Sequence, residues 1–184
     1  MPWNALQRLY SQDALATEIT GSATAGDIEL AALYVWYDNL PGVEARLMSF
    51  EDVMQRMENI VTVENTLALG TTGDYTGEEA LNSEFNLLRA NTDYALLGYL
   101  CSVECLAIRW RGVDFGNLGV GGPGHETEKE MTANWFSNIA QQTGIPAIPV
   151  FNSSNQAGLL IDGVQDENGA DPLVISILAQ LRMQ

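Results

Sequence analysis

The chain has 184 residues, of which 46% are hydrophobic and 17% charged, and 24 acidic against 8 basic residues give it a formal net charge of −16. This length and apolar content predict a single domain, residues 1–184, with a substantial core. The acidic excess repels phosphate groups, which argues against direct binding of nucleic acid or of an anionic membrane surface. No apolar run is long enough for a membrane-spanning helix, and residues 1–10 lack the pattern of a secretory signal.

Residues 1–26 are expected to form a short helix and a linker ahead of a core at residues 27–184. Pro2–Ala16 has apolar residues at roughly helical spacing, with proline acceptable at the helix start. The following tract is rich in threonine, glycine and alanine, which is typical of a loop, with a short strand as an option at Glu18–Thr20.

Strands are predicted at the start of the core. Ile28–Tyr37 is rich in β-branched and aromatic residues, the composition of a strand. Asn39–Gly42 contains Pro41 and marks a turn. Val43–Met48 is then expected to be a short return strand.

A helix is predicted to begin at Ser49, because Ser49 and Asp52 have the spacing of a capping box with aspartate in place of glutamate. Its expected apolar face consists of Phe50, Val53, Met54, Met57 and Ile60. Ile60–Leu69 then shows the alternation of a strand, with Asn65 interrupting its apolar side.

The stretch Asp93–Arg111 is predicted to be the centre of the fold, because it is apolar and strand-forming almost to its end. Its nineteen residues exceed an ordinary strand, so we expect a bend or a division into two strands at Gly98 or at Cys101–Ser102. Before it, residues 85–88 carry a weaker strand signal.

The tract Gly112–Gly124 has six glycines in thirteen residues. Glycine contributes no side chain to a core, so this composition predicts a long connection with unusual dihedrals or close backbone contacts, not an ordinary core strand. No lysine directly follows Gly124, and Pro123 removes a backbone donor, which argues against a phosphate-binding loop.

The second half of the chain begins with a predicted helix, because Thr127 and Glu130 form a capping box and Gly144 is placed to end the helix. Ile145–Phe151 is apolar but contains two prolines, so it is expected at a sheet edge or at a strand end.

The last two apolar runs, Gly158–Gln165 and Leu173–Leu181, flank a segment dense in turn-forming residues and are predicted to form an antiparallel hairpin. The second run has leucine and isoleucine spaced by four residues, so a helix is the alternative there. In sum, the pattern predicts a mainly β protein, an antiparallel β-sandwich of jelly-roll type with two or three short helices in its connections.

Catalytic signatures are weak. His125 is the only histidine and lies in an acidic loop, where a solvated side chain is favoured over a catalytic base. Cys101 and Cys105 are too few for a zinc site and are expected to be buried thiols. We therefore expect no enzyme activity and no cofactor.

Carboxylates cluster around residues 162–171. Asp162, Asp166 and Asp171 are a weak candidate set of calcium ligands, although a solvated turn is favoured. Carboxylate pairs, with Glu126 as a further candidate, leave a hydrolase as a minor alternative. The aromatic residues that are candidates for a sugar-binding platform are instead expected to be buried in the core or at subunit contacts: Tyr34, Trp36, Tyr37, Trp110, Trp135 and Phe136.

The order of features across residues 28–181 resembles small jelly-roll coat proteins of viruses and phages. The resemblance is carried by Asp93–Tyr99, Gly116–Gly124, Ile148–Asn152 and the final pair of strands. It implies a structural subunit of a virion, assembled in the host cytoplasm, with copies of itself and other particle proteins as partners. The sequence has no basic arm for a genome. The resemblance then implies a shell that does not itself bind the genome, or a subunit at an outer position in the particle. A major coat, a minor or cement protein and a head–tail joining protein all remain open.

Self-assembly is the function expected from this resemblance, without a small-molecule substrate. The candidate contact residues are Trp3, Gly116, Gly119, Gly121, Gly122 and Pro123. The alternative is a non-viral oligomeric β-sandwich that binds a ligand or carbohydrate.

Overall fold

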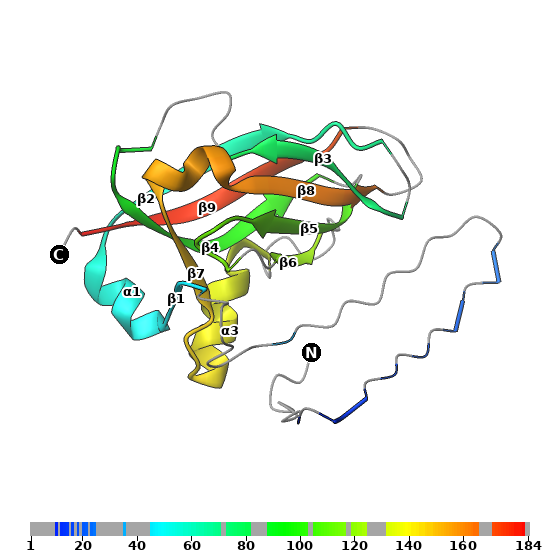
Figure 1. Cartoon of the computed structure of the whole chain (residues 1–184), viewed down its shortest axis with the longest axis horizontal. Coiled ribbons are helices and arrows are strands. Elements are labelled where there is room, and N and C mark those ends of the chain that lie inside the picture. The colour runs from blue at the N-terminus through cyan, green and yellow to red at the C-terminus, as the bar shows by residue number, and fades with distance from the viewer. Residues whose placement is uncertain are drawn as a thin grey trace.

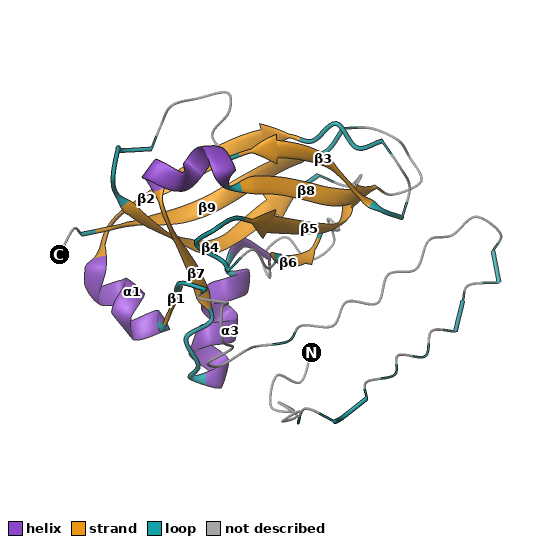
Figure 2. Cartoon of the chain, viewed as in Figure 1, coloured by secondary structure: helices purple, strands orange, loops and turns teal. Residues whose placement is uncertain are grey.

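A computed structural model describes residues 45–70, 73–81, 88–102, 105–116, 119–124, 132–165 and 171–182, with single residues and short pieces between 10 and 35. Strands dominate it and form two antiparallel sheets, as predicted (Figures 1 and 2). Pro2–Ala16 and Ile28–Tyr37 fall mostly outside the described residues. Tyr10 and Val35, which are described, are exposed and belong to no helix or strand. None of the helices in the described part is long and apolar enough to cross a membrane.

The described strands divide between a five-stranded and a four-stranded sheet. In order across the sheet, the first contains β1 (Leu47–Met48), β7 (Ile148–Asn152), β4 (Asp93–Cys101), β9 (Leu173–Leu181) and β2 (Met57–Thr66). The second contains β3 (Tyr75–Ala80), β8 (Leu160–Gln165), β5 (Cys105–Arg111) and β6 (Val120–Pro123).

The pairing of the eight strands from β2 to β9 is nested. β2 pairs with β9, β3 with β8, β4 with β7 and β5 with β6, all antiparallel. Between consecutive strands the chain passes from one sheet to the other, except from β5 to β6, which are neighbours in one sheet. The chain from β2 to β9 is therefore ordered like one long hairpin whose two arms cross repeatedly between the sheets.

One hydrophobic core joins the sheets. Tyr99 of β4 and Trp110 of β5 have ring centroids 4.9 Å apart, and Phe136 lies within 6.4 Å of both by the same measure. Because large aromatic side chains contribute much of the buried apolar area, this contact between the sheets is a major part of their packing.

The central stretch Asp93–Arg111 divides as predicted near Cys101–Ser102. Its two strands do not pair with each other, because β4 belongs to the first sheet and β5 to the second. Gly98 lies at a register shift between β4 and β9, and a Cβ there would overlap the backbone of Thr132 and Ala133. Glycine at this position therefore lets the segment before α3 (Trp135–Thr143) approach the sheet.

The helix predicted at Ser49 is α1 (Phe50–Arg56), and the Ser49 side chain accepts a hydrogen bond from the Asp52 amide as expected. The assignment of Met57 and Ile60 to this helix was wrong. Met57 is already extended and begins β2, and Ile60 pairs with Ala179 of β9. The ladder with β9 satisfies the backbone of these residues and so prevails over their helical spacing.

The predicted hairpin of the last two runs was wrong in its pairing. Both runs are strands, β8 and β9, but each lies inside a different sheet. β9 lies between β4 and β2, and β8 lies between β3 and β5. A strand inside a sheet has two partners, and here both come from earlier parts of the chain.

The remaining predictions around α3 have different outcomes, and the end of the helix at Gly144 is confirmed. Gly144 ends α3 in the left-handed conformation at φ 71°, which glycine adopts at low cost. The capping box at Thr127 and Glu130 lies outside the described residues. The expected edge position of Ile145–Phe151 was wrong, because β7 lies between the two-residue β1 and β4; Pro149 is the second residue of β7, so the alternative of a strand end holds.

Candidate functional site

The glycine-rich tract contains a strand, which the composition argument did not predict. β6 occupies Val120–Pro123 at the edge of the second sheet and pairs with β5. A Cβ on Gly121 would overlap the carbonyl of Ile108, and one on Gly122 would overlap the Tyr99 hydroxyl. The expected close backbone contacts are therefore present, and these two glycines serve packing within the chain.

The other candidate contact residues are placed as follows. Gly116 lies in a turn after β5 at φ 64°, and a Cβ added at Gly119 would lie 3.0 Å from the side chain of Arg109. Pro123 ends β6, and its carbonyl accepts a hydrogen bond from Tyr99 at 2.7 Å. Trp3 lies outside the described residues.

The three calcium candidates do not share one loop. Asp162 is a strand residue of β8 and only 2% exposed, Asp171 is exposed just before β9, and Asp166 lies outside the described residues. Within the described part of the chain, no group of three or more histidine, cysteine, aspartate or glutamate residues is placed to hold a metal. His125 and Glu126 also lie outside it.

Asp162 is bound by two arginines of the adjacent strand β5. Arg109 donates from Nε to Oδ1 at 2.7 Å and from Nη2 to Oδ2 at 3.1 Å, and Arg111 Nε donates to Oδ2 at 3.1 Å. Arg111 also pairs with Glu78 of β3. A buried carboxylate needs such partners, so the two arginines explain how Asp162 is accommodated inside the sheet.

Tyr75 of β3 covers the Arg109 guanidinium, with the arginine Cζ 3.9 Å from the ring centroid. Burial raises the pKa of the Tyr75 hydroxyl, although the positive charge of Arg109 opposes this shift. The contacts of Arg109 with Tyr75 and Asp162 therefore link three neighbouring strands, β3, β8 and β5.

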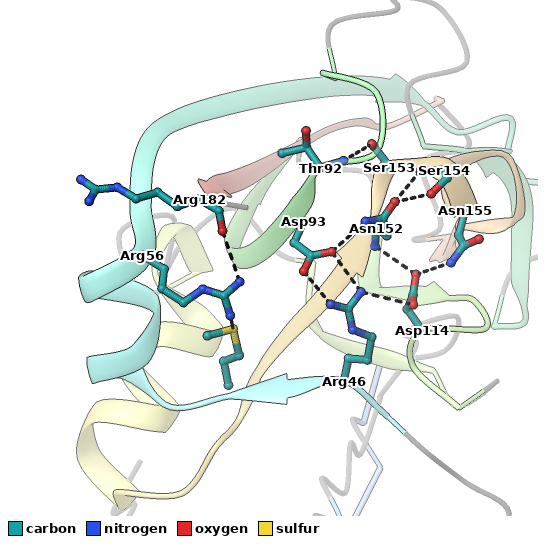
Figure 3. Close-up of polar contacts among 11 residues, drawn as sticks. Arg46, Arg56, Thr92, Asp93, Asp114, Asn152, Ser153, Ser154, Asn155 and Arg182 are labelled. Carbon is teal, nitrogen blue, oxygen red and sulfur yellow. Dashed lines mark hydrogen bonds and ion pairs between the residues drawn. The ribbon is translucent and has the colours of Figure 1, made fainter. Parts of the chain in front are cut away.

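A second arginine site lies around Arg46, just before β1 (Figure 3). Arg46 donates to both carboxylate oxygens of Asp93, at 3.1 and 2.7 Å, and pairs with Asp114 at 3.6 Å. Burial opposes ionisation of Asp93, but hydrogen bonds from Arg46 and Asn152 prevail and lower its pKa. The bonds to Asp93 likewise raise the pKa of Arg46.

Asp114 extends this site to the end of β7. Its Oδ2 accepts from the backbone amide of Asn152 at 3.1 Å and from the Asn155 side chain at 3.0 Å. The site therefore connects residues next to β1, β4, β5 and β7, which Figure 3 shows converging on the two carboxylates. We name Arg46, Asp93 and Asp114 the Arg46 clamp.

A pocket of about 240 Å³ opens at the start of β2 and the end of β9. Five of its six lining residues are polar, and the lining consists of Glu58, Arg89, Thr92, Gln180, Leu181 and Arg182. Glu58 contacts Gln180 at 3.4 Å and Arg182 at 3.7 Å. We name this the β2–β9 pocket.

Sequence reasoning missed these arginine sites, although part of the signal was present. Arg109 and Arg111 alternate within a strand-like run, which places both on one face, and Asp162 is the only charge in an apolar run. The Arg46 clamp joins residues 47 and 68 positions apart, and nothing local in the sequence indicates those contacts.

The aromatic side chains considered for a sugar platform are buried where the structure describes them. Trp110 and Trp135 are 1% exposed and Phe136 is 5% exposed. Comparison of the chain with protein-family models, with curated proteins and with solved structures finds no match.

Proposed function

We propose that the chain is a jelly-roll structural subunit of a virion or similar particle, which assembles with copies of itself. The observation that supports this most is the nested pairing of β2·β9, β3·β8, β4·β7 and β5·β6 across two sheets. Eight strands ordered in this way are expected of a jelly roll, an architecture used by viral capsid proteins, lectins and cupins.

Two further observations favour a shell subunit within that set. Trp110, Trp135 and Phe136 are committed to the core and are not available to stack on a sugar. The single histidine of the sequence is too few for a histidine-based metal centre of the kind that binds through several imidazoles.

The charge distribution affects the association of copies of this chain. Arg46, Arg109 and Arg111 are bound to carboxylates of the same chain, so they are already engaged and offer little to the carboxylates of another copy. Copies with a net charge of −16 repel one another at low ionic strength. Salt of about 0.1 M or more shortens the range of this repulsion to roughly 10 Å and is expected to promote assembly.

Light scattering after size exclusion, followed by negative-stain microscopy, tests the proposal. Purified chain is brought from low to high ionic strength at several concentrations. We expect regular assemblies to form as salt increases. A glycan array in the same study would detect binding of defined sugars, and such binding without assembly would contradict the proposal in favour of a lectin-like protein.

A further inference from the structure

The β2–β9 pocket is lined by two arginines whose side chains have the fewest partners among the arginines in the described part of the chain. Six arginines are described there: Arg46, Arg56, Arg89, Arg109, Arg111 and Arg182. Arg46, Arg109 and Arg111 are held by carboxylates, and Arg56 donates to the Arg182 carbonyl and contacts the sulfur of Met48. The remaining two, Arg89 and Arg182, line the same pocket although they are 93 positions apart.

Among the described residues, no side chain holds either guanidinium group by a hydrogen bond. Within the described part of the chain, the side chain of Arg89 forms no hydrogen bond or ion pair, and the residue is exposed. The Arg182 side chain is 66% exposed and meets Glu58 only at 3.7 Å. Figure 3 shows its guanidinium pointing away from the Arg46 clamp, while its backbone carbonyl receives Arg56.

We propose that the β2–β9 pocket binds carboxylates of a second copy of this chain, with Arg89 and Arg182 as the binding residues. Arginine presents several N–H donors in a plane that suits a carboxylate. With 24 acidic and 8 basic residues, the surface of another copy is rich in that group. The inference rests on the proposed self-assembly and adds the contact that counteracts repulsion between copies.

Glu58 provides a test that distinguishes binding of a carboxylate in this pocket from a purely structural role of its arginines. Its carboxylate already occupies one side of the pocket and competes for Arg182. Replacing it with the neutral, similarly shaped glutamine is expected to strengthen binding of an incoming carboxylate. Glu64 is exposed on the same strand outside the pocket lining, so Glu64→Gln makes the same change in net charge and is the matched control.

The direct test uses a soluble probe, a peptide Asp-Glu-Asn-Gly-Ala-Asp with the sequence of residues 166–171, and its counterpart with amides in place of the acids. Calorimetric titration is expected to detect only the acidic peptide. Arg89→Gln and Arg182→Gln should each weaken its binding about tenfold, in line with the loss of charge-assisted hydrogen bonds. Gln141→Glu, at an exposed position of α3, makes the net charge more negative by the same amount and should leave binding nearly unchanged.

The same variants are then compared in the salt-dependent assembly experiment. We expect Glu58→Gln to assemble at lower salt than Glu64→Gln, and Arg89→Gln to require more salt than Gln141→Glu. Circular dichroism and thermal unfolding check that each variant is folded.

The outcomes separate this inference from the proposed function. If the wild type assembles and Arg89→Gln assembles equally well, the pocket contact is wrong while self-assembly stands. If the wild type does not assemble, the second copy is wrong as the ligand, whether or not the acidic peptide binds. Equal binding of the acidic and amide peptides, or of neither, would overturn carboxylate recognition itself.

Discussion

Arg109 donates two hydrogen bonds to the Asp162 carboxylate across adjacent strands, at 2.7 and 3.1 Å, and Asp162 is only 2% exposed. Two positive groups thus accompany one buried negative group, because Arg111 binds the same carboxylate. This arrangement makes Asp162 a structural residue of the β3–β8–β5 sheet.

Asp162→Asn should therefore reduce the free energy of unfolding substantially. Removing one partner of a buried ion pair typically costs 3–5 kcal/mol, but both arginines are about one third exposed, so a loss of about 2–3 kcal/mol is expected. Urea unfolding followed by circular dichroism measures it. Glu78→Gln, at a half-exposed partner of Arg111, is the control and should cost less than about 1 kcal/mol. Equal costs for the two variants would contradict the account.

The Arg46 clamp should make stability sensitive to acid. The folded-state pKa of Asp93 is lowered, so its stabilising contribution is present above the ordinary aspartate pKa of about 4 and is lost as the pH falls through the lower folded value. At neutral pH, Asp93→Asn is expected to cost about 1 kcal/mol, because the pair is partly exposed.

Thermal unfolding from pH 7 down to pH 2 measures this effect. The difference in Tm between the wild type and Asp93→Asn should be largest near neutrality and should disappear at the acid end. Asp74→Asn, in an exposed turn, serves as the control. A Tm difference that grows with acid would have the wrong sign.

Gly121 should be required for packing inside the monomer. A Cβ there would overlap the Ile108 carbonyl, which belongs to the paired strand and has little freedom to move. Gly121→Ala is expected to destabilise by about 1–3 kcal/mol. At Gly70 no atom lies within 4 Å of an added Cβ, so Gly70→Ala should change stability by less than about 0.5 kcal/mol. If Gly121→Ala keeps full stability and loses only assembly, the glycine acts at a subunit contact.

Local signals in the sequence predicted the class of fold better than its pairing. Ser49 and Gly144 were found at the ends of their helices because capping depends on neighbouring residues. The partners of β8 and β9 were missed because strand pairing depends on residues far along the chain, such as Val61 of β2 opposite Leu178 of β9. β6 was missed because the close approach that favours Gly121 is visible only when β5 lies beside it.

For the candidate sites as well, local features were predicted from the sequence and long-range partners were not. Glycine content indicated close backbone contacts, and these exist around Gly121 and Gly122. Asp162 was grouped with Asp166 and Asp171 by proximity in sequence, whereas its real partners are Arg109 and Arg111 on another strand. Charge pairs across a sheet depend on register, which a single sequence does not reveal.

The molar mass in solution, measured by light scattering across a salt and concentration series, tests the central claim most directly. The account predicts particles of a defined mass many times the 20.0 kDa of one chain, forming more readily as salt rises. A mass of one chain at every salt and protein concentration would contradict it.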